Sequence, residues 1–487
     1  MAGRTTRTED AASVTDLERW AAAASFSHRG SLGPVETALW RAERHPALSG
    51  TNCIVIVLDQ APQWDRFLAA HEWGTSLVRR LRQRVLEPAL PTTYPVWVDD
   101  AKFSLEHHVR RRTVGGAGEL ADALERAQRI ALSPFDRARP LWQGTLLTGM
   151  ADGSAVYVLK IHHALFDALG SVQLLSMLQS STREHTADKP LTPRPPAPSA
   201  AGAPVDAVSL ATSGAVAELV AVPARAFTAA RMGLYALREP GAAVSEGLRY
   251  AASVRRLVSP PPAPPSPLFT ARGGRRWHFL AIEAPLAELA AAGHSVGASL
   301  QDAFVAAMLG GLRRYHEQHG VQVGDLPVSI RISLDRVDDP MSGNRFAGAM
   351  IAAPAGVEDP ADRIAAVRGE VLSLHVEPAL DAFRAAAPVA ARLPSDLVAA
   401  VLAGGAVADM SVATNAGPTR TAYMAGAKVD AMYTFGPLPG VALSASLLSC
   451  VDTACVGINV DSDAVADLDV LQRCLREGLD EVLALTV

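Results

Sequence analysis

Short apolar strands and amphipathic helices alternate in both the first and the last part of this chain. β-branched apolar runs such as TNCIVIVLD predict strands, whereas apolar residues at three- and four-residue spacing, as in SLQDAFVAAMLGGLRRYHEQHG, predict helices. The predicted strands cover residues 51–59, 154–161, 275–285 and 326–333, and the predicted helices cover residues 64–86, 118–132 and 299–320. The recurrence of this mixture indicates two α/β halves.

Two proline-rich stretches separate the halves. Residues 189–204 and 259–269 have the composition of extended connectors, and the Ala, Leu, Val and Arg residues between them favour two or three helices over 206–257. We therefore expect an N-terminal half over residues 1–187, a proline-bounded helical linker over 188–272 and a C-terminal half over 273–487.

Length and charge agree with this division. The 487 residues exceed the roughly 250–300 that one hydrophobic core usually serves. With 49% hydrophobic residues, 20% charged residues and a net charge of −5, the composition is that of a globular protein without a basic surface for nucleic acid. We expect no nucleic-acid partner.

Cysteine spacing and hydropathy indicate where the protein acts. The four cysteines lack C-x-x-C spacing, so we expect free thiols and no metal site. The N-terminus has no apolar segment typical of a secretory signal, which favours the cytoplasm. No window reaches the length of about 18 uncharged apolar residues that a membrane span requires, although peripheral contact with a membrane or lipid droplet stays open.

The stretch YVLKIHHALFDALG carries the candidate chemistry. A strand ends near Ile161 and a helix begins near Ala168, so His162 and His163 lie at a strand end, where clefts are common. A neutral imidazole is a suitable general base for a hydroxyl, and one well placed is worth about 10²- to 10⁴-fold in rate. The sequence has no G-x-S-x-G motif that would indicate a serine nucleophile instead.

The histidines and the aspartate of this stretch also have purely structural interpretations. A second pair, His107 and His108 in LEHHVRRR, has no aspartate after it, and histidines of this kind usually serve packing or the surface. Asp167 can orient the first pair or start the helix, or it can anchor the loop through a buried arginine. Adjacent histidines point in different directions and no H-x-x-x-H follows, so metal binding is disfavoured.

HHALFDA resembles the HHxxxDG signature of acyltransferases that use CoA thioesters or carrier-bound acyl groups. The flanking sequence is similar to the bacterial wax ester synthase/diacylglycerol acyltransferase family. The similar segments, in the family's order, are SPFDRARPLWQ, LQDAFVAAMLGGLRRY, PVSIR, GNRFAGAMIAAP and VATNAGPTRTAYMAGAKVDAMYTFGPL. The resemblance covers roughly residues 50–480 and is weakest over the linker.

This resemblance implies a fold and an activity. The fold is α/β (α+β), with two chloramphenicol-acetyltransferase-like halves, each a mixed sheet flanked by helices, and a tunnel between them. The activity is acyl-CoA-dependent O-acyl transfer by direct attack in a ternary complex. Acyl-CoA is a co-substrate and no cofactor is expected. The acceptor would be a long-chain alcohol, a diacylglycerol or a specialised hydroxylated metabolite.

The resemblance also assigns roles to residues. His163 would be the general base and His162 its supporting neighbour, while Asp167 would form a structural salt bridge with Arg331 of PVSIR. Gly170 would support the site. Residues assigned to the substrate tunnel are Gln301, Asp302, Asn344, Asn415, Gly417 and Pro418, with Asn344 equally able to be a turn residue. Pro140, Leu141 and Trp142 would serve packing.

Two departures from the family pattern concern substrate preference. Ala168 stands where the signature has glycine, and its Cβ restricts both positive φ and close substrate approach. Gln301 replaces an asparagine and is one methylene longer. Neither change removes the base, but both leave the acyl and acceptor preferences open.

Two further hypotheses remain. A condensation-like enzyme would take its acyl group from an acyl carrier protein and would need a basic patch at the tunnel mouth, for which RRLRQR (79–84) and HHVRRR (107–112) are candidates. A binding or scaffold protein would keep the fold without the chemistry. Turnover that disappears in His163→Ala would exclude the scaffold.

Overall fold

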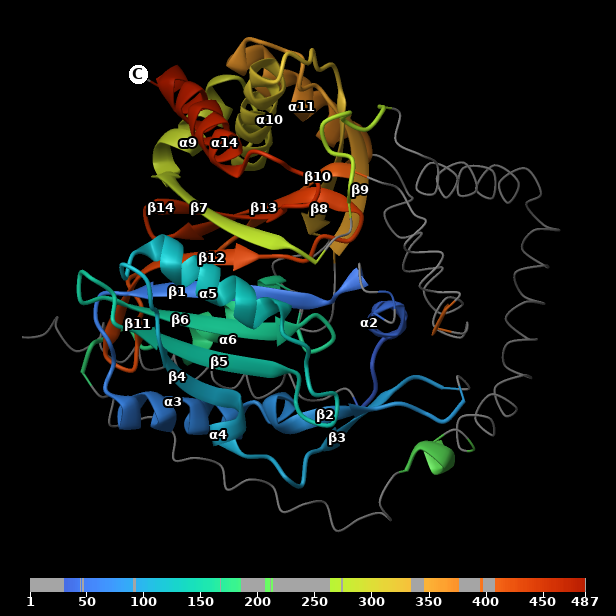
Figure 1. The fold of residues 1–487 in the computed structure, drawn as a ribbon, viewed down its shortest axis with the longest axis vertical. Coiled ribbons are helices and arrows are strands. Elements are labelled where there is room, and N and C mark those ends of the chain that lie inside the picture. The colour runs from blue at the N-terminus through green and yellow to red at the C-terminus, as the bar shows by residue number, and fades with distance from the viewer. Residues whose placement is uncertain are drawn as a thin grey trace, which may run out of the picture.

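Two six-stranded sheets, each associated with helices, make up the protein (Figure 1). The computed structural model describes residues 30–43, 45, 48–90, 93–166, 168–184, 206–210, 212, 263–272, 275–333, 346–375, 395–396 and 408–486.

The first sheet has the strand order β11-β12-β1-β6-β5-β4 and is antiparallel except between β4 and β5. Its strands are β1 (Thr51–Leu58), β4 (Val109–Thr113), β5 (Trp142–Thr148), β6 (Ala155–His162), β11 (Tyr423–Met424) and β12 (Ala427–Phe435). The associated helices are α2 (Pro34–Ala42), α3 (Trp64–Leu77), α4 (Leu105–His108), α5 (Leu120–Leu132) and α6 (Ala168–Leu178). A separate ribbon pairs β2 (Gln83–Leu86) with β3 (Val96–Asp99).

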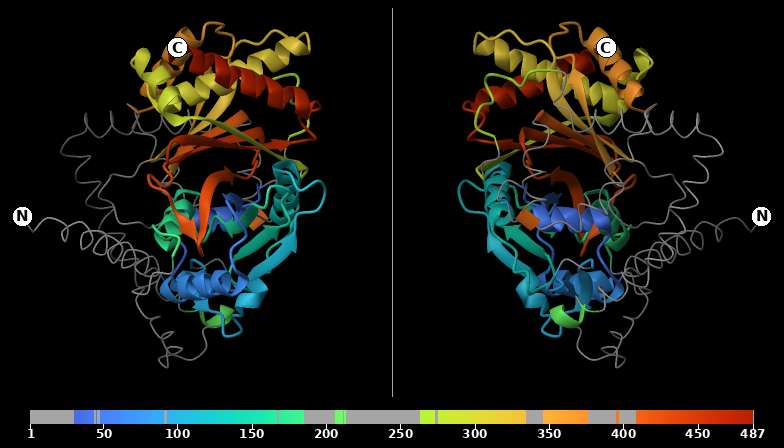
Figure 2. Two further views of the ribbon diagram at one scale, coloured as in Figure 1. Left: turned by 90° about the vertical axis from the view of Figure 1, so that its left-hand side faces the viewer. Right: turned by 90° about the vertical axis from the view of Figure 1, so that its right-hand side faces the viewer.

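The second sheet has the order β7-β14-β13-β10-β8-β9 and is mixed, because β10 runs parallel to both β8 and β13. Its strands are β7 (Trp277–Pro285), β8 (Leu326–Ser333), β9 (Phe346–Ala353), β10 (Ala408–Asn415), β13 (Val441–Cys450) and β14 (Thr453–Asp461). The helices α9 (Leu286–Ser295), α10 (Leu300–Gln318), α11 (Pro360–His375) and α14 (Leu468–Leu483) cover the side turned away from the first sheet (Figures 1 and 2).

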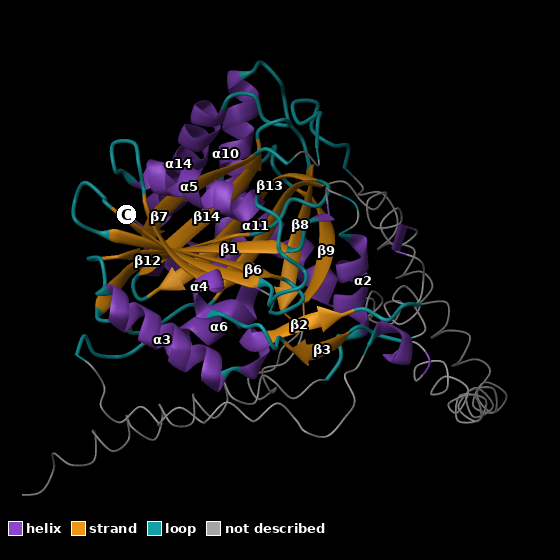
Figure 3. Ribbon diagram, turned by 60° about the horizontal axis from the view of Figure 1, so that its bottom comes forward, coloured by secondary structure: helices purple, strands orange, loops and turns teal. Residues whose placement is uncertain are grey.

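Strand β12 joins the two halves. It comes from the C-terminal part of the chain but pairs with β1 of the first sheet, with Cys53 opposite Phe435. A Cβ on Gly457 of β14 would lie 2.5 Å from the carbonyl oxygen of Thr434, so the β12 backbone also lies directly on the second sheet. Phe279 of β7 stacks on Phe435 with 4.0 Å between ring centroids. The two sheets therefore share a packed seam, visible in Figure 3, and diverge where β12 ends.

The predicted elements match most of this architecture. The strands predicted over 51–59, 154–161 and 326–333 are β1, β6 and β8, and the helices predicted over 118–132 and 299–320 are α5 and α10. The fold of two mixed α/β halves is therefore confirmed. The divisions expected at residues 187/188 and 272/273 border residues outside the described ranges, as do most of the predicted linker helices, and they stay predictions.

The helix predicted over 64–86 is wrong at its C-terminal end. Helix α3 stops at Leu77, a 3₁₀ turn covers Arg79–Arg82, and the last four residues form β2. Val78 has extended backbone angles, and the Arg80 guanidinium lies 4.3 Å from the ring centroid of Trp97 on the paired β-ribbon. Pairing with β3 thus overrides the local helical spacing.

None of the helices that the structure describes has, by itself, the length and apolar composition of a membrane-spanning segment. Helices α9 and α10 pass a test of length and hydropathy only when they are taken together, and a bend of 95° separates them.

Candidate active site

The histidine pair lies where β6 ends, next to the starts of two neighbouring strands. The backbone N–H of His162 donates to Leu141 O at 3.0 Å, and that of His163 donates to Gly50 O at 2.7 Å. Leu141 directly precedes β5 and Gly50 directly precedes β1. Both histidines are buried, with 3% and 6% of their surface exposed. The ends of β1, β5 and β6 therefore fix the backbone of the pair.

Each ring nitrogen of His162 lies next to a polar group. Nδ1 accepts the N–H of Ala164 at 2.9 Å, so the ring proton of the neutral imidazole is on Nε2. Nε2 lies 2.8 Å from Oε2 of Glu43, the residue that follows α2. The rings of Trp40 and Phe135 contact this imidazole edge-on, at centroid distances of 5.3 and 5.8 Å. His162 is thus held in one orientation and one tautomer, which suits a positioning role rather than proton transfer.

The Glu43 carboxylate accepts hydrogen bonds from a backbone N–H and from an arginine. Its Oε1 accepts the backbone N–H of Gly50, and Arg137 donates to its Oε2 at 2.9 Å. Burial alone would raise the pKa of Glu43, but His162, the Gly50 N–H and Arg137 outweigh burial and lower the pKa to about 2. An ionised Glu43 therefore connects α2, the start of β1 and the histidine pair at neutral pH.

Replacing Glu43 by glutamine should lower kcat by about 10- to 100-fold, the scale of a misplaced catalytic group. The carboxylate accepts the Gly50 N–H through Oε1 and lies 2.8 Å from His162 Nε2 through Oε2, whereas an amide presents its NH₂ group to one of these two partners. The measurement is kcat for acyl transfer, with Glu125→Gln, a change in an exposed pair with Arg129, as the control. Equal rates in Glu43→Gln and Glu125→Gln would contradict this role.

The same substitution has a pH signature in stability. Because the folded pKa of Glu43 lies below the unfolded value of about 4.3, its contribution is complete above pH 4.3 and is lost as the pH falls towards 2. The difference in unfolding free energy between wild type and Glu43→Gln should shrink over that window.

The structure describes only some of the other residues predicted for the site. Asp167 and Asn344 lie outside the described residues, and so does the side chain of Arg331 on β8, whose backbone pairs opposite Gly348. Gly170 is buried in α6. The salt bridge between Asp167 and Arg331 stays a prediction.

The segment after β10 lies against β13. Asn415 Nδ2 donates to Ser446 Oγ at 3.3 Å, and the N–H of Gly417 donates to Ser449 Oγ at 3.1 Å. A Cβ on Gly417 would lie 2.1 Å from the carbonyl oxygen of Ser449, so this approach requires glycine. Pro418 O accepts the N–H of Val451 at 2.8 Å. Asn415 thus reaches the seam between the sheets, whereas Gly417 and Pro418 anchor the chain that leaves it.

Gln301 and Asp302 begin helix α10. Asp302 forms a capping box with Ser299, and Arg368 donates to its Oδ2 at 3.3 Å. Helix capping and ion pairing thus account for the burial of the Asp302 carboxylate. A tunnel position for Gln301 and Asp302 stays a prediction.

The second histidine pair serves packing. His108 Nδ1 is bonded to Trp142 O at 2.8 Å, and the two rings stack at 4.7 Å between centroids. Trp142 Nε1 donates to Leu81 O at 2.8 Å, and Leu141 is completely buried. These contacts agree with the structural interpretation of His107–His108 and of the Pro-Leu-Trp motif.

The two arginine-rich segments differ. In the first, Arg79 Nε donates to Asp99 at 3.0 Å and Arg80 is buried against Trp97. In the second, Arg110, Arg111 and Arg112 are exposed on β4, where charges protect a sheet edge from pairing with other chains. Neither segment adjoins the histidine pair in the sheet order.

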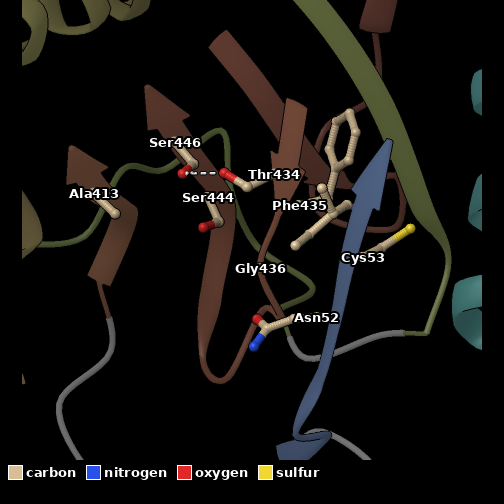
Figure 4. Close-up of a pocket in the computed structure, with 9 residues that line it drawn as sticks. Asn52, Cys53, Ala413, Thr434, Phe435, Gly436, Ser444 and Ser446 are labelled. Atoms are coloured by element: carbon tan, nitrogen blue, oxygen red, sulfur yellow. Dashed lines mark hydrogen bonds between the residues drawn. The ribbon is translucent and has the colours of Figure 1, made fainter. Parts of the chain in front are cut away.

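A small pocket lies where β12 leaves β1 (Figure 4). Its walls come from β1, β10, β12 and β13, and its polar lining includes Asn52, Thr434, Ser444 and Ser446. Asn52 is opposite Ile161, the residue before His162, so the pocket begins one residue pair away from the histidines. The pocket thus brings both halves of the chain to the candidate site.

Sequence reasoning missed Glu43 and Asn52. The signals were present, since Glu43 directly follows the helix PVETALWRA and Asn52 interrupts the apolar run of TNCIVIVLD. Their significance depends on distant partners. Among the residues that the structure describes, no cluster of three metal-ligating side chains occurs, and the four cysteines are buried free thiols.

The sequence matches two family models and a set of curated relatives. The model of the wax ester synthase/diacylglycerol acyltransferase catalytic domain matches residues 28–304, and that of the family's C-terminal domain matches residues 342–482. A protein of Mycobacterium tuberculosis H37Rv, named as a candidate diacylglycerol O-acyltransferase, is 36% identical over 465 residues, which is 93% of this chain and 92% of that one. Another such protein of the same strain is 27% identical over 88% of this chain and 86% of its own.

Solved structures share the fold. The wax ester synthase/diacylglycerol acyltransferase of Marinobacter aquaeolei VT8 superposes with a TM-score of 0.59 at 18% identity, over 93% of this chain and 98% of that one. The first condensation domain of the calcium-dependent antibiotic synthetase gives 0.58 at 16% identity, over 94% and 97%. A starter condensation domain of rhizomide synthetase in complex with C8-CoA gives 0.56 at 11% identity, over 94% of each chain.

The two matched models span both halves of the chain. The chain therefore belongs to the wax ester synthase/diacylglycerol acyltransferase family and is an acyltransferase.

Proposed function

We propose that this acyltransferase moves an acyl group from a CoA thioester to a hydroxyl acceptor, with His163 as the general base. The observation that carries the proposal is the arrangement of His162, whose two nitrogens are engaged by Ala164 and Glu43. That arrangement leaves proton transfer to its neighbour. His163 follows a residue held in this way, and its own N–H donates to Gly50 O, so the end of β6 and the starts of β1 and β5 set the backbone position of His163.

The reaction is a direct displacement. The imidazole of His163 takes the proton from the acceptor hydroxyl while the oxygen attacks the thioester carbonyl. The tetrahedral intermediate collapses with cleavage of the C–S bond, and the imidazolium returns the proton to the departing CoA thiolate. The ester and free CoA are the products, and no acyl-enzyme forms.

The names of two similar proteins support these classes of donor and acceptor. The curated relatives carry diacylglycerol O-acyltransferase in their names, and a condensation domain of the same fold was solved in complex with C8-CoA. We therefore extend an acyl-CoA donor and a lipid-like hydroxyl acceptor to this chain. A carrier protein is the second candidate donor, because condensation domains share the fold and Arg110, Arg111 and Arg112 offer an exposed basic strip.

The donor and acceptor classes can be tested with purified protein. Acyl-CoAs of several chain lengths are each incubated with a long-chain alcohol, a diacylglycerol or a small hydroxylated acceptor, and both ester and free CoA are measured. We expect CoA release that depends on the acceptor and equals the ester formed. Transfer only from an acyl carrier protein would favour the second donor, and binding without turnover would favour a scaffold.

A further inference from the structure

The most informative feature outside the histidine pair is the buried side-chain amide of Asn52. This residue is 3% exposed and lies in β1, between Thr51 and Cys53, whose partners on β6 are His162 and Lys160. Among the residues that the structure describes, neither Nδ2 nor Oδ1 of the amide has a hydrogen-bond partner. Buried polar groups are almost always satisfied, so an amide with both ends unpaired indicates a missing partner.

The surroundings of Asn52 are polar and uncharged. Figure 4 shows the amide projecting from β1 towards β13, where Ser444 and Ser446 line the facing wall. Ser446 Oγ lies 2.6 Å from Thr434 Oγ1 and accepts from Asn415 Nδ2 at 3.3 Å, so that wall already forms a hydrogen-bonded network. Ser444 is 5% exposed.

The lining specifies the chemistry of the occupant. None of the described residues that line the pocket is charged, and an unpaired ion would be costly to bury there. Asn52 offers both a donor and an acceptor, and a hydroxyl group can satisfy both at once because it accepts and donates. The pocket therefore suits a neutral hydroxyl better than a carboxylate, a phosphate or an alkyl chain.

The position specifies which molecule carries that hydroxyl. Gly50, two residues before Asn52, accepts the N–H of His163, and a Cβ on Gly50 would lie 3.2 Å from His162 Nε2. Asn52 and its pocket are thus two residues along the chain from the carbonyl group that holds the backbone of the proposed base. We propose that the Asn52 pocket binds a second hydroxyl of the acceptor, and that the enzyme selects diol acceptors over simple alcohols.

This inference rests on the proposed function for its acceptor, so the test separates the two. A 1,2-alkanediol and the 1-alkanol of equal chain length are compared as acceptors for one acyl-CoA. We expect wild type to favour the diol by about 10- to 100-fold in kcat/KM, the factor that one or two hydrogen bonds provide. Asn52→Ala should reduce this ratio to near one by lowering the rate with the diol.

Two further variants distinguish loss of the pocket from general damage to the fold. Ser444→Ala, on the facing wall, should also reduce the preference. Gln83→Ala removes another buried amide, in β2, whose Nε2 donates to Asp99 Oδ1 at 3.1 Å, and it should change both acceptors by the same factor. Equal loss with both acceptors in Asn52→Ala, or no preference in wild type, would overturn the proposal.

Calorimetric binding of the diol without acyl-CoA gives a readout besides turnover. Diol binding that is lost in Asn52→Ala supports the pocket even if no acceptor is acylated, and in that case the proposed transfer chemistry is what fails. Equal binding of the diol by wild type and Asn52→Ala counts against the pocket.

Discussion

Replacing His163 by alanine should lower acyl transfer by about 10²- to 10⁴-fold, the usual contribution of a positioned general base. The acceptor hydroxyl then has no imidazole to take its proton, because both nitrogens of His162 are engaged by Ala164 and Glu43. The loss should appear in kcat with little change in KM for acyl-CoA, since the base acts on the transition state. Initial rates of ester formation give both constants.

The chain supplies a matched control for this change. His107→Ala makes the same substitution in the second histidine pair, where His107 adjoins the His108 ring, which packs on Trp142, and it should leave kcat within about threefold of wild type. His163→Gln keeps a polar side chain but removes the base, and it should resemble His163→Ala. Substantial activity in both His163 variants would show that another group takes the proton.

Replacing Glu481 by alanine should lower the free energy of unfolding of the second half by about 3–5 kcal/mol. Glu481 lies on α14 and pairs with Arg363 of α11, whose side chain is completely buried. Arg363 also donates to Ala306 O at 2.9 Å and Val357 O at 2.7 Å, so it holds α11 against α10. Removal of the carboxylate leaves this guanidinium buried beside Arg314 without its anion.

A neighbouring glutamate tests whether burial causes the effect. Glu477 lies one turn earlier on α14, is about half exposed at 49% and approaches Arg314 at 3.8 Å. Glu477→Ala should cost under about 1 kcal/mol, because solvent screens exposed pairs. Chemical denaturation followed by circular dichroism gives both values, and similar costs for the two variants would contradict the distinction.

Local patterns predicted the elements that build the site. The apolar run that became β1 and the run that became β6 were found within one residue at each end, because both strands are continuous buried segments. The histidines at the end of β6 followed from the same pattern and from the HHxxxD resemblance. The pairing of β12 with β1 could not be predicted, since it joins Cys53 to Phe435 across most of the chain.

The residues that sequence reasoning missed share this dependence on distant partners. Glu43 becomes informative only when α2 places it 2.8 Å from the His162 ring. Asn52 becomes informative only when β12 and β13 enclose its amide. Likewise, the strand β2 was misread as helix because its partner β3 lies outside the window that shows helical spacing.

The central claim is that His163 activates the acceptor for direct attack on acyl-CoA. A single-turnover experiment tests it most directly. Enzyme in excess over acyl-CoA is mixed with and without acceptor, and free CoA and the intact mass of the protein are followed in time. Direct attack predicts CoA release only with acceptor, at a rate lost in His163→Ala, and no mass increase of the protein. Stoichiometric CoA release without acceptor, accompanied by an acylated protein, would contradict the account.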